Sequence, residues 1–283
     1  MIKLGDFELY LITDGTVQVD AGGPFGLVPR SLYQRYFQPD PNNLIPMALT
    51  CMLVKAGGHN ILIDTGLGDK LTDRMKENWN LSRPEGLIEG LARHGVSPDQ
   101  IDIVIDTHLH GDHCAGNTSF GEMGIVPTFP KAHYYVQKRE HYDATHTNER
   151  TRATYYEVNF QPLVDSGQMT LLEGDTEIIP GIRGVLTPGH TPGHQSIWLE
   201  SRGEHALFVS DLASYAVHFE RLSWMTSYDV EPLVTLESKR RWQQWALNHH
   251  ALLIFQHDPV IKAGYGERQG DKFLIHPTLN EHD

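Results

Sequence analysis

The chain has 283 residues, 40% of them hydrophobic, and a formal net charge of −13. This hydrophobic content is sufficient for a substantial core, and the acidic balance disfavours a nucleic-acid partner because it repels phosphate backbones. No stretch approaches the roughly eighteen apolar residues of a membrane span, and the first residues do not read as a secretory signal. The two cysteines cannot build a disulfide framework. We therefore expect a cytoplasmic protein without a membrane or nucleic-acid partner.

The first 63 residues predict two β-hairpins with a long loop between them. Four segments have the alternation or apolar content of strands: residues 7–12, 17–19, 49–55 and 60–63. Thr-Asp-Gly at 13–15 is typical of a tight turn, and so is Gly-Gly at 57–58. Residues 21–46 are rich in glycine, proline and aromatic residues. We expect them to form an ordered loop that lines a pocket, contacts a partner subunit or covers its own core.

The rest of the chain alternates helices and strands in two similar series. Helices are predicted at residues 84–94, 138–146, 150–164 and 232–250. Strands are predicted at residues 101–105, 132–137, 169–172, 176–179, 182–186, 195–199, 206–209 and 252–255. Because no linker separates the two series, we expect one domain, residues 1–283, built from two halves that share a core.

A polar cluster directly follows the strand predicted at 101–105. Residues 106–113 read Asp-Thr-His-Leu-His-Gly-Asp-His, so three histidines and a carboxylate fall within six residues. Imidazole nitrogens and carboxylate oxygens are ligands that zinc and related divalent ions prefer, and the end of a strand can direct several of them inward. The cluster therefore predicts a metal site; the alternative is a solvated polar loop.

These residues match the His-x-His-x-Asp-His motif, and the chain resembles the metallo-β-lactamase superfamily. The resemblance implies an α/β protein with an αββα sandwich, two mixed β-sheets flanked by helices, and a mononuclear or dinuclear metal site. Two further stretches are similar to motifs of that family. Asp64-Thr65-Gly66 corresponds to the first motif, whose aspartate supports the metal loop, and the sequence at 187–194 corresponds to the third.

The resemblance also implies a ligand set. One metal would be held by His108, His110 and His190, a second by Asp112, His113 and His257, with Asp211 bridging the two. His249 and His250 compete with His257, but they fall in a predicted helix. His194 is expected to orient its loop, and Cys114 is expected to be a buried thiol.

The implied chemistry is hydrolysis with two divalent ions, expected to be Zn²⁺. His110 occupies a position that is Glu in the diiron flavoprotein branch, which disfavours a redox role. Asp112 is a candidate catalytic group as well as a ligand, because it could take a proton during the reaction. Tyr215, four residues after Asp211, corresponds to the tyrosine that holds the substrate carbonyl in lactonases, or else is a packing tyrosine.

The sequence is most similar to the branch that contains N-acyl homoserine lactone lactonases and methyl parathion hydrolases. We expect a hydrolase for a small-molecule substrate that opens lactones or related carboxylic esters; the alternatives are a phosphotriesterase and a non-catalytic metal-binding protein. Five apolar residues either wall a substrate pocket or belong to the core: Phe25, Leu27, Phe219, Trp224 and Met225. A homodimer that uses residues 21–46 is also expected.

Overall fold

The computed structural model describes residues 1–122 and 124–280, and its main feature is a pair of seven-stranded sheets. The first sheet has, in spatial order, β1 (Ile2–Leu4), β2 (Phe7–Asp20), β3 (Leu44–Ala56), β4 (His59–Ile63), β5 (Ile103–Ile105), β8 (His133–Gln137) and β9 (Met169–Leu172). The second has β10 (Thr176–Ile179), β11 (Ile182–Leu186), β12 (Gln195–Ser201), β13 (Glu204–Phe208), β14 (Leu252–Ile254), β15 (Ile261–Gln269) and β16 (Lys272–Asn280). Both sheets are mixed, because β4, β5, β8 and β9 run parallel and so do β13 and β14.

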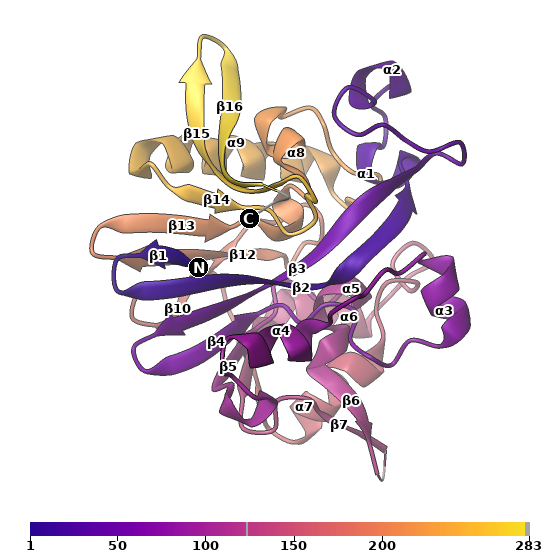
Figure 1. Ribbon diagram of the computed structural model, residues 1–283, viewed down its shortest axis with the longest axis vertical. Helices are drawn as coiled ribbons and strands as arrows, with labels where there is room; N and C mark the ends of the chain where they lie inside the picture. Colours follow the sequence, from indigo (N-terminus) through magenta and orange to yellow (C-terminus); the bar gives the residue numbers. More distant parts are fainter. Residues whose placement is uncertain (123, 281–283) are drawn as a thin grey trace.

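Helices cover the outer face of each sheet (Figure 1). On the first sheet, α4 (Leu87–Arg93) and α7 (Gln161–Asp165) share a buried cluster with the strands, and α6 (Lys138–Thr145) packs beside β8. On the second sheet, α8 (Ala216–Glu220) and α9 (Pro232–His249) pack in the same way. The αββα sandwich expected from the resemblance is therefore confirmed.

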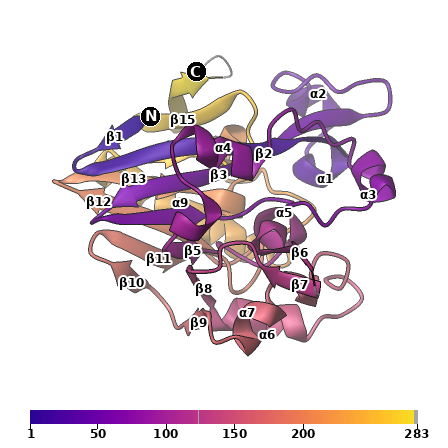
Figure 2. The same ribbon diagram turned by 60° about the horizontal axis from the view of Figure 1, so that its bottom comes forward.

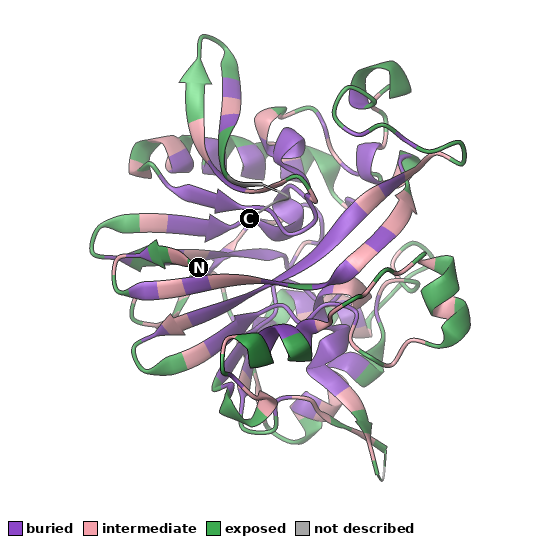
Figure 3. Cartoon of the chain, viewed as in Figure 1, coloured by how far each residue is buried: buried purple, intermediate pink, exposed green. Residues whose placement is uncertain are grey.

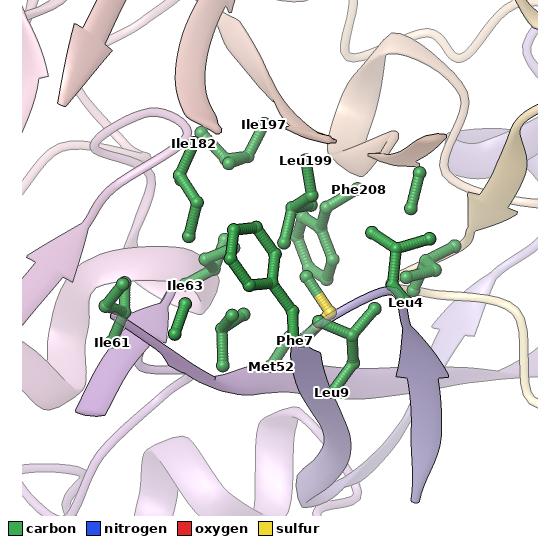
Figure 4. Close-up of a cluster of buried hydrophobic side chains, with 14 of the residues drawn as sticks. Leu4, Phe7, Leu9, Met52, Ile61, Ile63, Ile182, Ile197, Leu199 and Phe208 are labelled. Carbon is green, nitrogen blue, oxygen red and sulfur yellow. The ribbon is translucent and has the colours of Figure 1, made fainter. Parts of the chain in front are cut away.

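The two sheets meet in a core made of aliphatic side chains and phenylalanines (Figure 4). Ile61 and Ile63 alternate along β4 so that both point inward, where they join Ile197 and Phe208 of the second sheet. All four are fully buried, and burial of each such side chain contributes about 1.5–3 kcal/mol relative to exposure. The core therefore joins the first half of the chain to the second.

The hairpin predicted at residues 7–19 is wrong, because β2 continues through 13–15 without turning. The whole strand pairs with β3, and the Thr-Asp-Gly sequence produces only a register shift between Thr13 and Thr16. The side chain of Asp14 is buried and accepts hydrogen bonds from the backbone of Gly68 and Leu87. A tertiary contact has overridden the local turn preference.

Residues 21–46 and 150–164 also differ from expectation. The first segment contains α1 (Gly22–Phe25) and α2 (Arg30–Tyr33), and its rings at Phe25, Tyr33 and Phe37 are buried in the molecule's own core. The predicted helix at 150–164 is mostly turns, with a short 3-10 helix (Glu157–Asn159) before α7. Here Tyr155 pairs with His110 in an isolated β-bridge, which a helix would not allow.

Several described elements were not expected from the sequence. They are α3 (Asp73–Asn78), the small sheet of β6 (Thr118–Gly121) and β7 (Gly124–Pro127), helices α1, α2 and α8, and strands β15 and β16. Helices α1, α2 and α3 lie toward the same side of the molecule in both orientations (Figure 2), with α3 apart from the other two in Figure 1. The residues of α2 and α3 are largely exposed, whereas α1 buries Pro24 and Phe25 (Figure 3). Within residues 1–122 and 124–280, no helix combines the length and apolar character needed to cross a membrane.

Candidate metal centre

The predicted ligands converge where strands of both sheets end. The loops after β5, β11, β13 and β14 carry all seven, and backbone hydrogen bonds hold the loops together. The amide of Gln195 donates to the carbonyl of Thr107 at 3.0 Å, and the amide of Ala48 donates to the carbonyl of His257 at 3.0 Å. The positions of the ligand loops are therefore fixed by the pairing of strands and loops across the two sheets.

Three imidazole nitrogens form the first group of possible ligands. His110 Nδ1 lies 3.1 Å from His108 Nε2 and 3.1 Å from His190 Nε2. A tetrahedral zinc ion about 2.0–2.1 Å from each nitrogen requires the nitrogens to lie roughly 3.3 Å apart. The observed spacing is therefore suited to a small divalent cation.

A second group is formed by Asp112, His113 and His257. His113 Nε2 lies 3.2 Å from His257 Nε2, and Asp112 Oδ2 lies 3.7 Å and 3.8 Å from these two atoms. Asp211 lies between the groups: Oδ2 is 3.1 Å from His190 Nε2 and 3.5 Å from His113 Nε2, while Oδ1 is 3.2 Å from His257 Nε2. One carboxylate thus faces both sets of nitrogens.

The ring nitrogens that face away from the centre have hydrogen-bond partners, and these partners show whether the histidines are oriented to bind a cation. His113 Nδ1 lies 3.0 Å from Asp64 Oδ2, His190 Nδ1 lies 3.0 Å from Asp229 Oδ1, and His257 Nδ1 lies 2.7 Å from the carbonyl of Ala48. Each of these acceptors favours a proton on Nδ1 and leaves the lone pair of Nε2 directed at the centre. The residues present therefore fit divalent cations.

Electrostatics at the centre also favour a cation. Burial, followed by the neighbouring imidazoles, holds the pKa values of His108 and His110 well below the usual histidine range. Burial alone would raise the pKa of Asp211, but His257, His190 and His113 outweigh it and lower its pKa well below the usual range. The site thus offers an ionised carboxylate and, at His108 and His110, neutral imidazoles. Burial opposes the charge of His113 and His190 as well, but the carboxylates of Asp112 and Asp211 beside the first, and of Asp211 and Asp229 beside the second, outweigh it and raise the pKa values of these two histidines.

The supporting residues predicted from the sequence occupy the expected places. Asp64 accepts hydrogen bonds from the amide of Thr107 at 2.7 Å and from its hydroxyl at 2.8 Å, so it supports the metal loop as predicted. His194 Nδ1 lies 2.7 Å from the hydroxyl of Thr187, and its Nε2 accepts from the amide of Asp211 at 3.2 Å. Cys114 is buried, as expected.

Two buried carboxylates were missed by the sequence analysis. Asp229 is the partner of His190, and it also accepts from the hydroxyl of Thr226 at 2.8 Å. Glu140, on α6, accepts from the amide of Leu109 at 3.0 Å and from the hydroxyl of Thr191, so it joins the two histidine loops. Neither lies in a motif, and only the three-dimensional contacts reveal the roles of these two carboxylates.

A cavity of about 190 Å³ opens onto the centre and is lined in part by Asp112, Asp211, Tyr215 and Tyr228. Tyr215 has a fully buried side chain, and its hydroxyl donates to the carbonyl of Pro46 at 3.1 Å. Tyr228 is 45% exposed. Burial, followed by the carboxylates of Asp112 and Asp211, raises the pKa of Tyr228 to about 12, so its hydroxyl stays protonated at neutral pH.

The apolar wall predicted from five residues is only partly present. Phe25 and Phe219 are fully buried core residues and line none of the described cavities. Leu27, Trp224 and Met225 line a second cavity of about 570 Å³. The side chains of Phe25 and Phe219 are held in separate clusters by α1 and α8, which the sequence did not predict.

A third cavity, of about 310 Å³, also adjoins the centre and is mainly apolar. Its lining includes Leu71, Met75 and Tyr156, and it shares Trp79 and Asp112 with the cavity at the centre.

Comparison with known proteins agrees with this geometry. An N-acyl homoserine lactonase from Bacillus thuringiensis is 27% identical over 230 residues, which cover 77% of this chain and 84% of that protein. The crystal structure of a probable metal-dependent hydrolase from Staphylococcus aureus has a TM-score of 0.89 at 28% identity and covers 98% of this chain and 100% of that one. The dizinc quorum-quenching lactonase AidC has a TM-score of 0.80 at 22% identity, with 98% of this chain and 96% of that one covered.

The sequence model of the metallo-β-lactamase superfamily matches residues 45–244 of this chain. This span contains six of the seven convergent side chains, all except His257. The chain belongs to the metallo-β-lactamase superfamily and is a metal-dependent hydrolase.

Proposed function

We propose that the protein is a dinuclear, zinc-dependent hydrolase that opens lactones or related carboxylic esters. The observation that carries this proposal is the convergence of seven side chains in three overlapping clusters, of which one, His108 with His113 and Asp211, joins the other two. The N-acyl homoserine lactonases among its relatives support the choice of substrate class. The ligand set, the number of ions and their identity as Zn²⁺ are parts of the same proposal.

The groups at the centre would each have a role in ester hydrolysis. Divalent ions bound there would supply a water molecule of lowered pKa and polarise the substrate carbonyl. Asp112 lies at the cavity wall, where its carboxylate can take the proton of the attacking water and return it to the leaving alkoxide. The balance is simple: a C–O bond to the water oxygen forms, the ring C–O bond breaks, and an acid and an alcohol result.

The mainly apolar cavity beside the centre supports substrates with an acyl chain. It adjoins the metal centre at Asp112 and is walled by aliphatic and aromatic side chains. We propose that this cavity, and not the one at Leu27, Trp224 and Met225, receives an apolar acyl group.

The remaining proposals rest on the sequence. They are a cytoplasmic location, the lack of a nucleic-acid or membrane partner, and a homodimer formed through residues 21–46. Leu27, whose side chain is fully exposed, Leu32, which is 39% exposed, and Tyr36, which is 41% exposed, are the large apolar side chains of this segment available to a partner. Light scattering at several concentrations tests the dimer.

Ring opening of N-acyl homoserine lactones tests the function. Each ring opened releases a proton, so a pH indicator follows the reaction with metal-replete protein. We expect activity in the wild type and in a His59→Ala control, which removes an exposed histidine, and loss in His108→Ala. A metal-replete wild type that opens no lactone would contradict the proposal, and assays with aryl esters and phosphotriesters would then identify the reaction class.

A further inference from the structure

The hydroxyl groups that line the cavity at the metal centre differ in whether they form hydrogen bonds within the protein. Most of them donate to a protein acceptor: Ser214 to Asp211, Thr154 to the carbonyl of Thr151, Tyr215 to that of Pro46, Thr226 to Asp229, and Ser227 to that of Gly23. The hydroxyl of Thr151 accepts from the amide of Asn148. The hydroxyl of Tyr228 forms no hydrogen bond with any residue in 1–122 or 124–280.

The loop that carries Tyr228 is held on both sides of this residue. The amide of Ser227 donates to the carbonyl of Gly23 at 2.9 Å, and the amide of Val230 donates to the carbonyl of His190 at 3.0 Å. Arg150 Nη2 donates to the carbonyls of Ser227 at 2.7 Å and of Asp229 at 3.0 Å, the two residues that flank Tyr228. The phenol is thus fixed relative to the loop of a candidate metal ligand.

The backbone of α1 sets the position of the phenol. A Cβ atom added at Gly23 would lie 1.8 Å from Tyr228 Oη and 2.4 Å from Cζ, so the tyrosine can occupy its place only because residue 23 has no side chain. A methyl group there would displace the far end of a flexible side chain, not the backbone. The hydroxyl of Tyr228 can therefore be removed by a substitution at residue 228 or displaced by a methyl group at residue 23.

We propose that Tyr228, and not Tyr215, donates a hydrogen bond to the carbonyl oxygen of the ester under attack. When water adds to the carbonyl carbon, the π electron pair moves onto this oxygen, and a fixed donor that faces it stabilises the developing charge. The phenol keeps its proton throughout, so it neither adds nor removes an atom from the reaction. Tyr215 is already bonded to Pro46 and contributes its buried ring to the wall.

This inference rests on the proposed function, and Tyr228→Phe tests it separately. With metal-replete protein and a lactone substrate, we expect kcat to fall by about 100-fold while KM changes by less than about two-fold, because the bond strengthens only in the transition state. Bound metal should stay at the wild-type level. Tyr142→Phe, which removes the hydroxyl of an exposed tyrosine on α6, is the matched control and should keep wild-type kcat.

A second variant displaces the hydroxyl of Tyr228 without changing residue 228 itself. Gly23→Ala should lower kcat to a similar extent because its methyl displaces the phenol, whereas Gly22→Ala, whose Cβ would approach only Asp20, should not. In a Tyr228→Phe background, Gly23→Ala should cause no further loss, since the hydroxyl is already absent. The three kinetic measurements together separate a loss of the hydrogen bond from a general disturbance of α1.

The outcomes are distinct. If the wild type opens lactones and Tyr228→Phe keeps full kcat, or if Tyr215→Phe alone shows the loss, the assignment to Tyr228 is overturned and the lactonase proposal stands. If the metal-replete wild type hydrolyses no carboxylic ester, the proposed function has failed, and the assignment fails with it.

Discussion

Asp229 accepts hydrogen bonds from His190 and Thr226 and so fixes the ring of a candidate ligand. Loss of such an outer partner typically lowers metal affinity by about 10- to 100-fold. We therefore expect Asp229→Ala to weaken binding at the centre by that factor and Asp229→Asn, which keeps an acceptor oxygen, to weaken it less. Titration against a chromophoric chelator measures both. Equal affinity in the wild type and Asp229→Ala would contradict the role.

His218 is buried against Phe25 and Tyr215, and neither ring nitrogen has a hydrogen-bond partner among residues 1–122 and 124–280. Burial, followed by the charge of Lys239, lowers its pKa to about 3. In the unfolded chain the ring has an ordinary pKa near 6.5, so below that pH the unfolded state takes up a proton that the folded state does not. Stability is therefore lost as the pH falls from about 6.5 towards 3.

A His218→Leu variant lacks this proton uptake. Between pH 6.5 and 4.5 we expect its free energy of unfolding to fall by about 2 kcal/mol less than that of the wild type. Urea unfolding at fixed free metal measures both proteins, and metal-linked effects common to the two cancel in the difference. Parallel curves across this range would show that His218 does not contribute to acid sensitivity.

The convergence of the seven candidate ligands and the support by Asp64 could be predicted because each lies at a strand end within a short motif. The resemblance to the family therefore supplies the ligand set, and the strand ends give the approximate place of each ligand. Asp229, Glu140 and Tyr228 could not be predicted in this way. The contacts of each join segments far apart in the chain, such as Glu140 with Leu109 and Thr191, or Tyr228 with Gly23. Their residue types are common on surfaces and carry no local signal.

Among the elements, the regular strands and the amphipathic helices α4, α6 and α9 follow from hydrophobic periodicity. The failures occur where a tertiary contact opposes the local preference. The buried carboxylate of Asp14 pairs with the partly exposed Arg83 at 2.8 Å, and this favours a continuous β2 over a turn. Tyr155 is held by Glu140 at 3.0 Å and pairs with His110, so residues 150–160 cannot close into a helix.

Trp79, the residue directly after α3, gives a test of substrate choice. Trp79 lines both the cavity at the metal centre and the apolar cavity beside it. If the apolar cavity holds the acyl group, Trp79→Ala should lower kcat/KM about ten-fold more for a decanoyl than for a butanoyl homoserine lactone, because only the longer chain loses apolar contact. Steady-state kinetics with both substrates measures the ratio.

Trp224→Ala is the matched comparison, because Trp224 lines the other cavity. It should affect both chain lengths equally. A chain-length effect in Trp224→Ala but not in Trp79→Ala would show that the acyl group binds in the cavity lined by Trp224, and this would contradict our proposal.

At the scale of the whole molecule, the candidate ligands come from both sheets, so bound metal would join the two halves. A ligand present at a thousand times its Kd stabilises the folded state by about 4 kcal/mol. We expect a chelator to lower Tm by about 10 °C. His59→Ala should behave like the wild type, and His257→Ala should show a smaller change. A chelated protein with unchanged Tm would count against metal ligation.

We also propose that residues 1–283 form one domain, because Ile63 and Phe208 belong to one buried cluster. Thermal unfolding should then be a single transition at any fixed metal concentration. Tryptophan fluorescence and far-ultraviolet circular dichroism should give the same midpoint within error. Two separated midpoints would indicate halves that unfold independently.

The candidate ligands follow strand ends, whereas much of the cavity wall comes from segments between regular strands, such as residues 146–160 and 222–231. These two parts of the site are therefore separable in an evolutionary sense. Insertions or exchanges in the wall segments can alter which esters fit while the strand pairing that fixes the histidines stays the same. Asp229, which fixes the ring of His190, and Tyr228, our proposed donor, are the positions in these segments that such exchanges must keep. Changes at the other wall positions let selection, or a protein engineer, alter specificity without touching the groups assigned to the reaction.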